Sequence, residues 1–370
     1  MLGTRPDAVK MAPVVKEFAR FPDQVRQVVI STGQHREMLD QVLSVFQIKP
    51  DHDLQLMRDR QTLSDLTARA LTSLVPLLET EKPDLVIAQG DTTTTFVASL
   101  AAFYARAKFG HVEAGLRTDN KFDPFPEEMN RRLTTRLADL HFAPTTLAAE
   151  NLLREGVHEA LVRVTGNTVV DALRLVAGQS FTFEDPAVAE AVERPGRMVL
   201  VTAHRRENWG EPMRAVCDAI LKIVERFADV HVVFPMHRNP VVREVVEPAL
   251  GGHERILLTE PPEYVPFVHL MKASHLILTD SGGVQEEAPG LGKPVLVLRK
   301  TTERPEGVHA GNARLVGTDT EVILAEASRL LSEPDAYAAM SQAVSPYGAG
   351  EAARLIREWV FETFAISAAA

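Results

Sequence analysis

Short apolar runs alternate with longer amphipathic segments along nearly the whole chain, and this alternation constrains the fold more than any other feature. Runs such as Leu85-Val86-Ile87 and Val295-Leu296-Val297-Leu298 contain no polar residue, which is typical of parallel strands buried on both faces. Segments of about ten or more residues with helical periodicity lie between most of these runs. The pattern predicts an α/β fold of βαβ units, with binding loops at the carboxyl ends of parallel strands.

The expected elements can be placed by residue number. Helices are expected at Glu127–Leu137, at Pro212–Phe227 and, as the final helix of the chain, at Glu351–Phe364. The expected strands are Val25–Ser31, Leu85–Gln89, Phe109–Glu113, Leu140–Ala143, Leu161–Thr165, Met198–Thr202, Val230–Phe234, Arg255–Leu258, His275–Thr279 and Val295–Leu298.

The chain has 370 residues, too many for one ordinary hydrophobic core, so two domains are expected. A boundary is placed near residues 165–168, because the density of strands falls between Gly178 and Gly196 and a new set begins at Met198. The prediction is a first domain of residues 1–167 joined by the C-terminal helix at 351–370, and a second domain of residues 168–350.

Composition argues against several classes of protein. The formal net charge is −10 and the pI is about 5.7, which disfavours general nucleic-acid binding because that needs a basic surface. No apolar run approaches the roughly 20 residues of a membrane span, and the first residues lack the apolar core of a signal peptide. The single cysteine, Cys217, excludes an intramolecular disulfide and fits a reducing cytoplasm; a buried, small apolar role is expected for it.

Two strand-to-helix turns are suited to holding an anion. The first is Gly3-Thr4-Arg5-Pro6-Asp7, with Lys10 further along the same helix, and the second is Asp280-Ser281-Gly282-Gly283. A helix N-terminus offers free backbone N–H groups and a partial positive charge, which favour phosphate. An ordinary capped helix start has the same pattern. The Gly-Gly pair and the downstream acid Glu287 favour function for the second turn.

Three carboxylates lie between these turns along the chain. Asp91 and Glu113 each follow an expected strand, so they should meet at one edge of a sheet. Glu127 and Arg131 are spaced i,i+4 on an expected helix and share a face, for which a structural ion pair is the simpler explanation. Carboxylates held close together and away from water suit acid/base chemistry.

Basic residues follow the later strands. His204-Arg205-Arg206 comes just after an expected strand, and His237 and Arg304 follow others, so in an acidic protein they favour an anion. Asp51-His52-Asp53 is interpreted as a solvated loop rather than a metal site. The chain contains no Gly-x-x-x-x-Gly-Lys-Ser/Thr phosphate loop, no Gly-x-Ser-x-Gly elbow and no zinc-ligand spacing.

In their order, these motifs resemble those of the non-hydrolysing UDP-N-acetylglucosamine 2-epimerases, over essentially the whole chain. The resemblance implies a glycosyltransferase-B-like fold: two Rossmann-like domains whose parallel sheets face a deep cleft, usually in a homodimer. The matching motifs are Gly3-Thr4-Arg5-Pro6, Gly90-Asp91-Thr92, Val112-Glu113-Ala114-Gly115-Leu116-Arg117, Pro126-Glu127-Glu128-Met129-Asn130-Arg131, His204-Arg205-Arg206-Glu207, Asp280-Ser281-Gly282-Gly283 and Thr302-Glu303-Arg304-Pro305-Glu306-Gly307.

The chemistry implied by the resemblance is reversible inversion at C2 of UDP-N-acetylglucosamine, giving UDP-N-acetylmannosamine for surface polysaccharides. In the family route, the C1–O bond to UDP breaks while a base removes the C2 proton. A 2-acetamidoglucal and UDP remain trapped, and UDP then adds back as a proton returns to the opposite face. No cofactor and no metal are implied.

The resemblance also assigns roles by matching position. Its acid/base and catalytic candidates are Asp91, Glu113, Glu127, Arg131 and His204. Its candidates for binding the UDP moiety are Arg5, Lys10, His204, Phe267, Ser281, Gly282, Gly283, Glu287 and Arg304, with Glu287 at the ribose and Phe267 near the uracil. Some bacterial members bind a second UDP-N-acetylglucosamine as an activator, and the corresponding residues are Gln34, Glu37, Arg60, Gln61, Arg205 and His237, with Glu37 in place of an expected neutral amide.

One departure from the family pattern lies at the start of the sequence, where only Met1 and Leu2 precede Gly3 in place of a full strand. Without that full strand, backbone N–H and C=O groups of the neighbouring strands should lack hydrogen-bond partners. Three rival functions stay open on the sequence alone: a hydrolysing epimerase, a glycosyltransferase of the same fold and a non-catalytic sugar-nucleotide sensor.

Overall fold

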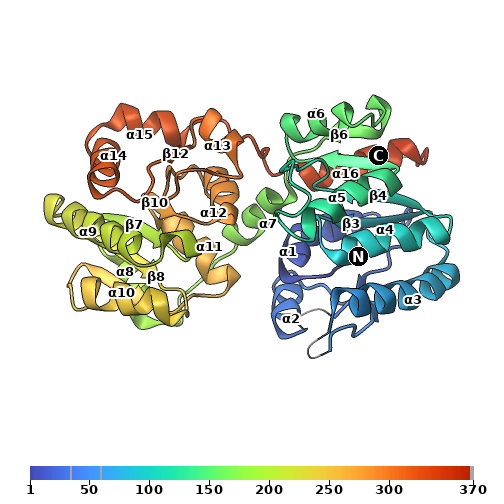
Figure 1. Cartoon of the computed structure of the whole chain (residues 1–370), viewed down its shortest axis with the longest axis horizontal. Helices are drawn as coiled ribbons and strands as arrows, with labels where there is room; N and C mark the ends of the chain where they lie inside the picture. Colours follow the sequence, from blue (N-terminus) through green and yellow to red (C-terminus); the bar gives the residue numbers. More distant parts are fainter. Residues whose placement is uncertain (34–35, 59–60, 367–370) are drawn as a thin grey trace. The chain divides into compact units, whose positions relative to one another are not determined.

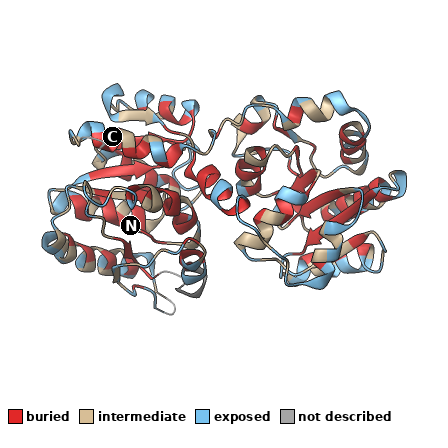
Figure 2. Cartoon of the chain, turned by 180° about the vertical axis from the view of Figure 1, so that it is seen from behind, coloured by how far each residue is buried: buried red, intermediate tan, exposed pale blue. Residues whose placement is uncertain are grey.

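The computed structural model describes residues 1–33, 36–58 and 61–366, and the chain divides into two compact units (Figure 1). Unit 1 comprises Met1–Ala172 with Tyr347–Ala370, and unit 2 comprises Leu173–Pro346. Each unit has its own parallel sheet and its own apolar core. Strands are largely buried in both, whereas exposed residues gather on the outer faces of the helices (Figure 2).

Unit 1 contains a four-stranded parallel sheet in the order β3-β4-β5-β6. Its strands are β3 (Leu85–Gln89), β4 (Lys108–Val112), β5 (Leu140–Ala143) and β6 (Val162–Val164). Its helices are α1 (Arg5–Phe18), α2 (Arg36–Val45), α3 (Leu63–Glu81), α4 (Thr93–Tyr104), α5 (Glu127–Leu137), α6 (Thr146–Arg154) and α16 (Ala352–Thr363), with α7 (Thr168–Ala177) spanning the division between the units.

Helix α16 packs within unit 1, although it comes from the far end of the chain. Trp359 meets Phe142 of β5 edge-on, with ring centroids 5.2 Å apart, and Arg357 pairs with Glu17 of α1 at 2.8 Å. The helix begins where Asp171 of α7 accepts hydrogen bonds from the backbone N–H groups of residues 352 and 353. The last helix therefore completes the core of the first unit.

The expected strand Val25–Ser31 is wrong for most of its length. Only β1 (Ile30–Ser31) is a strand, and it pairs in parallel with β2 (His52–Asp53). The interpretation of residues 51–53 as a loop is also wrong for two of the three residues. All three residues are polar, so no apolar run marks the strand, which pairs with β1 at only two positions. His52 Nε2 lies 2.9 Å from Oε1 of Glu81.

The first two residues take part in this region. The Leu2 N–H donates to the Ile30 carbonyl and the Thr32 N–H to the Leu2 carbonyl, both at 2.9 Å, and the Met1 amine donates to the Ile87 carbonyl at 2.9 Å. Beyond these contacts, the described residues place no strand between β1 and β3. A cavity of about 290 Å³ lies there, lined mainly by apolar side chains of α1, β3, α16 and residues 24–30.

Unit 2 contains a six-stranded parallel sheet in the order β12-β11-β10-β7-β8-β9. Its strands are β7 (Arg197–Thr202), β8 (Val230–Pro235), β9 (Ile256–Thr259), β10 (Leu276–Thr279), β11 (Val295–Val297) and β12 (Ala313–Leu315). Its main helices are α8 (Pro186–Glu193), α9 (Glu211–Arg226), α10 (Pro240–Leu250), α11 (Tyr264–Ala273), α12 (Gly282–Glu287), α13 (Pro305–His309), α14 (Thr320–Ser332) and α15 (Pro334–Ser341).

The nine expected strands after residue 84 are confirmed to within one or two residues at each end, as are the helices at 127–137, 212–227 and 351–364. Cys217 is fully buried in the core of unit 2, as expected, and burial raises the pKa of its thiol to about 12. β12 was not expected, because Ala313-Arg314-Leu315 is short and polar at its centre. Among the described residues, no helix is both long and apolar enough to span a membrane.

Candidate functional site

Glu113 directly follows β4 and has a positive φ of 62°, a conformation that is uncommon for residues other than glycine, asparagine or aspartate. Gly115 has a φ of 96°, and a Cβ there would lie 2.1 Å from the Ala148 carbonyl oxygen. The chain therefore turns sharply at residues 113–115, and only glycine fits its second bend. Unusual backbone of this kind concentrates at functional sites.

Three side chains from separate elements hold the Glu113 carboxylate, which is 8% exposed. Nζ of Lys10, on α1, lies 2.5 Å from Oε1, and Nδ2 of Asn167 donates to the same oxygen at 3.2 Å. The side-chain amide of Gln89, at the end of β3, donates to Oε2. One positive charge and two amide donors thus hold the carboxylate in one orientation. A carboxylate fixed in this way can accept a proton.

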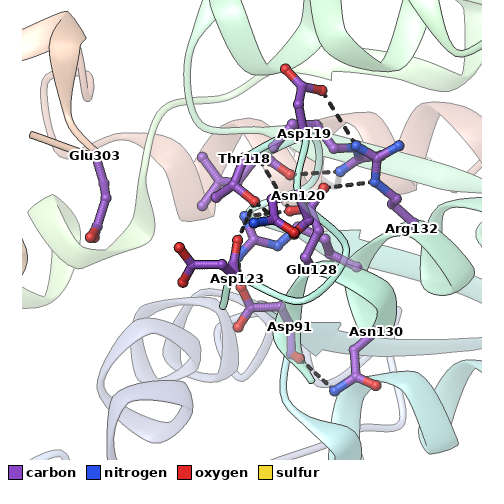
Figure 3. Close-up of polar contacts among 12 residues, drawn as sticks. Asp91, Thr118, Asp119, Asn120, Asp123, Glu128, Asn130, Arg132 and Glu303 are labelled. Atoms are coloured by element: carbon purple, nitrogen blue, oxygen red, sulfur yellow. Dashed lines mark hydrogen bonds and ion pairs between the residues drawn. The ribbon is translucent and has the colours of Figure 1, made fainter. Parts of the chain in front are cut away.

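Asp91 lies between β3 and α4, and α5 holds it in place (Figure 3). Its Oδ2 is 2.8 Å from Nη2 of Arg131, and its carbonyl oxygen accepts a hydrogen bond from Nδ2 of Asn130 at 3.0 Å. A Cβ on the preceding residue, Gly90, would lie 3.9 Å from Oε2 of Glu113. Asp91 and Glu113 therefore belong to neighbouring strand ends, as the sequence predicted for the two acids.

His111 supports this edge of the sheet from inside. It is fully buried, and its Nε2 lies 2.7 Å from the Gly90 carbonyl oxygen. Burial lowers the pKa of His111 to about 3. The imidazole is therefore neutral at ordinary pH, and its Nε2–H donates a hydrogen bond that fixes the Gly90 carbonyl.

A fully buried carboxylate, Glu128, ties α5 to the loop after β4 (Figure 3). Its Oε1 accepts a hydrogen bond from Nε of Arg132 at 2.6 Å, and its Oε2 accepts one from the Thr118 N–H at 3.2 Å. Nη1 of Arg131 lies 3.6 Å from Oε2. Arg131 is thereby held between Glu128 and Asp91.

The expected pairing of Glu127 with Arg131 is wrong. Arg131 pairs with Asp91 and Glu128, and no ion pair joins it to Glu127 in the described ranges. Glu127 opens α5 and is half-buried. Its neighbour Glu128 points into the protein instead, because successive residues of a helix face different directions.

The turn at the start of α1 is a capping box, in which Thr4 is the N-cap and Asp7 completes the box. Oδ2 of Asp7 accepts hydrogen bonds from the Thr4 N–H at 3.0 Å and from the Thr92 hydroxyl at 3.2 Å. A Cβ on Gly3 would lie 2.7 Å from this oxygen. Burial raises the pKa of Asp7 to about 6, despite these hydrogen bonds. Asp7 accepts the Thr4 N–H, so this N–H is not free for an anion. The basic group at the turn is the half-buried side chain of Arg5.

In unit 2, the centre of the site is Asp280, which directly follows β10 and is fully buried. Its Oδ2 accepts three hydrogen bonds, from the backbone N–H groups of His204 and Arg205 at 2.9 and 2.8 Å and from Nδ2 of Asn208 at 2.9 Å. Its Oδ1 lies 3.1 Å from Nδ1 of His204, without the alignment of a hydrogen bond. Burial opposes ionisation, but His204 and the backbone donors outweigh it and lower the pKa of Asp280.

The turn at 281–283 leads directly from Asp280 into α12. Ser281 is the N-cap residue, and its side chain makes no capping hydrogen bond, so the alternative of an ordinary capped helix start lacks the hydrogen bond that defines it. A Cβ on Gly282 would lie 3.8 Å from Nη2 of Arg205, which places this guanidinium over the turn. Glu287 ends α12 and is buried.

Three other candidates lie elsewhere in unit 2, Arg304 and Phe267 for the UDP site and His237 for the activator site. Arg304 precedes α13, and its guanidinium pairs with Glu286 of α12. Phe267 lies on α11 and is half-buried. His237 follows β8, and its ring stacks on that of His204 with centroids 5.7 Å apart.

The structure describes only some of the residues assigned to the activator site. Gln34 and Arg60 lie outside the described residues, and so does the side chain of Glu37, whose backbone belongs to α2. Gln61 accepts a hydrogen bond from the Arg58 N–H at 3.2 Å. Within residues 1–33, 36–58 and 61–366, no group of three or more His, Cys, Asp or Glu side chains is arranged to hold a metal ion.

Sequence reasoning missed the residues that hold the candidate acids. Glu128 and Asn130 stand inside a motif that was singled out for its neighbours, and Asp280 was noted only as the end of a strand. Gln89 and Asn167 are separated from Glu113 by 24 and 54 positions. No local pattern joins such distant positions, although each of them ends or follows an expected strand.

The chain is similar to known proteins along nearly its whole length. The family model described as UDP-N-acetylglucosamine 2-epimerase matches residues 17–360. A Bacillus subtilis protein named UDP-N-acetylglucosamine 2-epimerase is 54% identical over 358 residues, which are 97% of this chain and 93% of that protein. The Escherichia coli K12 protein of the same name is 50% identical, covering 97% and 96%.

A solved structure extends this similarity to three dimensions. The crystal structure of a Neisseria meningitidis UDP-GlcNAc 2-epimerase bound to UDP-GlcNAc has a TM-score of 0.83 and 47% sequence identity, and covers 98% of each chain.

Proposed function

Because the chain belongs to the UDP-N-acetylglucosamine 2-epimerase family, we propose that it interconverts UDP-N-acetylglucosamine and UDP-N-acetylmannosamine without releasing free sugar. The family's two-domain fold with parallel sheets agrees with the fold of this chain. The observation that carries the proposal is the Glu113 carboxylate, held on an unusual backbone by one cation and two amides beside the Asp91 turn. A protein that only binds a sugar nucleotide has no need of this arrangement.

The proposed reaction is an elimination followed by an addition. A carboxylate of unit 1 takes the C2 proton, the C–H electron pair forms the C1=C2 bond, and the C1–O pair leaves with UDP. The reverse addition returns a proton to the opposite face of C2 and re-forms the C1–O bond. Asp91, Glu113 and Glu127 are the proposed acid/base groups, and Arg131 orients Asp91.

The UDP moiety is proposed to bind to unit 2. His204, Arg205 and the turn at 281–283 lie together at the ends of β7 and β10, and Arg205 brings a positive charge to the N-terminus of α12. Groups of this kind stabilise charge on a departing diphosphate. Arg5, Lys10 and Arg304 are proposed as further cationic contacts, Glu287 as the ribose acceptor and Phe267 as a neighbour of the uracil.

The proposal is tested by incubating the protein with UDP-N-acetylglucosamine in deuterated water and following the reaction by proton NMR. UDP-N-acetylmannosamine with deuterium at C2, without net free sugar, is the expected product. Free N-acetylmannosamine with stoichiometric UDP would instead identify a hydrolysing enzyme. No change in the substrate would contradict the proposal and favour a sensor or a glycosyltransferase.

Three further expectations accompany this function. The enzyme should act as a cytoplasmic homodimer that supplies N-acetylmannosamine units for surface polysaccharides, and light scattering of the purified protein tests the dimer. An activator site formed by Gln34, Glu37, Arg60, Gln61, Arg205 and His237 should give a sigmoidal dependence of rate on UDP-N-acetylglucosamine. A hyperbolic dependence would count against that site.

A further inference from the structure

The two carboxylate oxygens of Asp280 contact different groups. Oδ2 accepts from the backbone N–H groups of His204 and Arg205 and from the Asn208 amide, which fixes the loop after β7 to the end of β10. Among the described residues, Oδ1 has no aligned donor, and it lies 3.1 Å from Nδ1 of His204. One oxygen therefore holds the loop, and the other faces the imidazole.

The rest of His204 is also fixed. Its carbonyl oxygen accepts a hydrogen bond from Nε1 of Trp209 at 3.2 Å, and its ring stacks on His237 with an interplanar angle of 20°. The His204 side chain is 38% exposed, so part of it stays open to solvent while Nδ1 lies against Asp280. Main chain and ring are thus positioned by different neighbours.

An ionised carboxylate can only accept hydrogen bonds, so it favours the tautomer in which the imidazole nitrogen that faces it carries the proton. The opposite nitrogen, Nε2, is then an acceptor in the neutral ring and a donor in the charged ring. This is the arrangement in which a buried acid orients a histidine for a partner on its far side.

We propose that Asp280 is a positioning residue for His204, holding Nδ1–H inward so that Nε2 is the nitrogen that meets the diphosphate. The identity of the ligand rests on the proposed function, whereas the tautomer is a property of the free protein. Asp280 itself does not touch the substrate in this proposal. It acts through the imidazole and through the loop that carries it.

The first measurement needs no variant at the acid. Long-range ¹⁵N–¹H spectra of the free protein at about pH 9, well above the ordinary histidine pKa, should show His204 protonated at Nδ1. The His204→Gln spectrum identifies its signals by their loss. Addition of UDP should shift the Nε2 resonance and leave Nδ1 nearly unchanged. A free protein with the proton on Nε2, or a UDP shift confined to Nδ1, would overturn the proposal.

The second measurement uses Asp280→Asn. The amide oxygen of the new side chain can replace Oδ2 as acceptor, and the amide NH2 group then faces Nδ1 of His204. An NH2 group donates hydrogen bonds, so Nδ1 must accept, and the imidazole proton should move to Nε2. The turnover number should fall by roughly 100-fold or more, because a histidine in the wrong tautomer cannot serve its partner. An unchanged tautomer, or a changed tautomer with unchanged turnover, would refute the positioning role.

Asn208→Ala is the matched control for the loop. It removes one donor to Oδ2 and leaves Oδ1 and the imidazole in place, so the His204 tautomer should stay that of the wild type. A tautomer change in this variant would show that the loop, rather than Oδ1, sets the proton, and would also overturn the proposal. Failure of the wild-type protein to epimerise UDP-N-acetylglucosamine would contradict the proposed function, while the tautomer of the free protein would still test the role of Asp280.

Discussion

Glu113 of unit 1 and Asp280 of unit 2 are both buried carboxylates that follow a parallel strand, but different kinds of donor hold them. Glu113 receives its contacts from the side chains of Lys10, Gln89 and Asn167, which come from three separate segments. Asp280 receives two of its three aligned hydrogen bonds from the backbone of one loop.

The difference teaches which parts of each site depend on residue identity. Backbone N–H groups survive almost any substitution of the loop residues that carry them, so the position of Asp280 depends mainly on the fold. The position of Glu113 depends on three particular side chains and on a backbone conformation that costs about 1 kcal/mol or more. The position of Glu113 should therefore be lost through side-chain substitutions that leave the fold of unit 1 intact, whereas the position of Asp280 should survive most substitutions of the loop residues that hold it.

The largest expected effect is on turnover in Glu113→Gln. The amide keeps the size of the side chain but cannot accept the C2 proton, so the turnover number should fall by about 10²- to 10⁴-fold. UDP affinity, measured by calorimetry, should change far less than turnover, because Lys10 is the one proposed UDP contact that pairs with Glu113 in the described residues. The exposed Glu79→Gln is the matched control and should retain wild-type turnover. Near-normal turnover in Glu113→Gln would exclude Glu113 from proton transfer.

The next expected effect is on the free energy of unfolding, which should fall by different amounts when the contacts of Asp280 and of Glu113 are removed. Asp280→Ala leaves two backbone N–H groups and one amide buried without their acceptor, so it should lower the free energy of unfolding by about 3 to 5 kcal/mol. Asn167→Ala, which removes one hydrogen bond to Glu113 and one to the Val169 N–H, should cost about 1 to 3 kcal/mol. Urea unfolding measures both. A larger loss in Asn167→Ala would reverse the comparison.

The sequence predicted the strands of the two larger sheets, except β12, because buried parallel strands leave apolar runs that few other elements produce. Leu140–Ala143 and Val230–Phe234 are examples in which even the first residue agrees. The same rule failed for residues 25–29, where the apolar character of Val25, Val28 and Val29 reflects packing rather than strand pairing. Hydrophobic patterning reports burial, and it identifies a strand only where neighbours supply the ladder.

The candidate acids were predicted, but their partners were not. Asp91 and Glu113 could be placed at one sheet edge because strand ends of a parallel sheet lie together. The pairing of Arg131 with Asp91 rather than Glu127 required the side-chain directions on α5, which spacing alone does not give. Contacts such as Asn167 with Glu113 depend on tertiary packing across 54 positions.

A third test compares the pH dependence of Asp7 and Asp280. Burial raises the pKa of Asp7 to about 6, so between about pH 4 and pH 6 the folded protein binds a proton that the unfolded chain has lost. Stability contributed by Asp7 is therefore lost as pH rises through that window, by about 3 kcal/mol. Asp7→Asn removes the titration, so its stability relative to the wild type should rise by this amount between pH 4 and pH 7.

Asp280 should behave in the opposite way, because its pKa is lowered in the folded protein. Its contribution is present above the ordinary aspartate pKa of about 3.9 and is lost only as pH falls below it. In a His204→Gln background, which removes the imidazole that faces Asp280, the difference in unfolding free energy between proteins with and without Asp280→Asn should therefore be flat from pH 5 to pH 7. A slope there, or a flat profile for Asp7→Asn, would contradict the assigned shifts.

The smallest effect tests whether the donors around Glu113 position it or merely stabilise the fold. Gln89→Met keeps a similar volume but removes the amide that donates to Oε2, so the carboxylate gains freedom about its remaining contacts with Lys10 and Asn167. The turnover number should fall by about 10- to 100-fold with the Michaelis constant unchanged, because misplacement of a reacting group costs rate rather than binding. The exposed Gln179→Met controls for the substitution itself. A loss confined to UDP affinity or to thermal stability would show that Gln89 holds the sheet edge and not the reacting carboxylate, and the contrast between the two units would then rest on Lys10 and Asn167 alone.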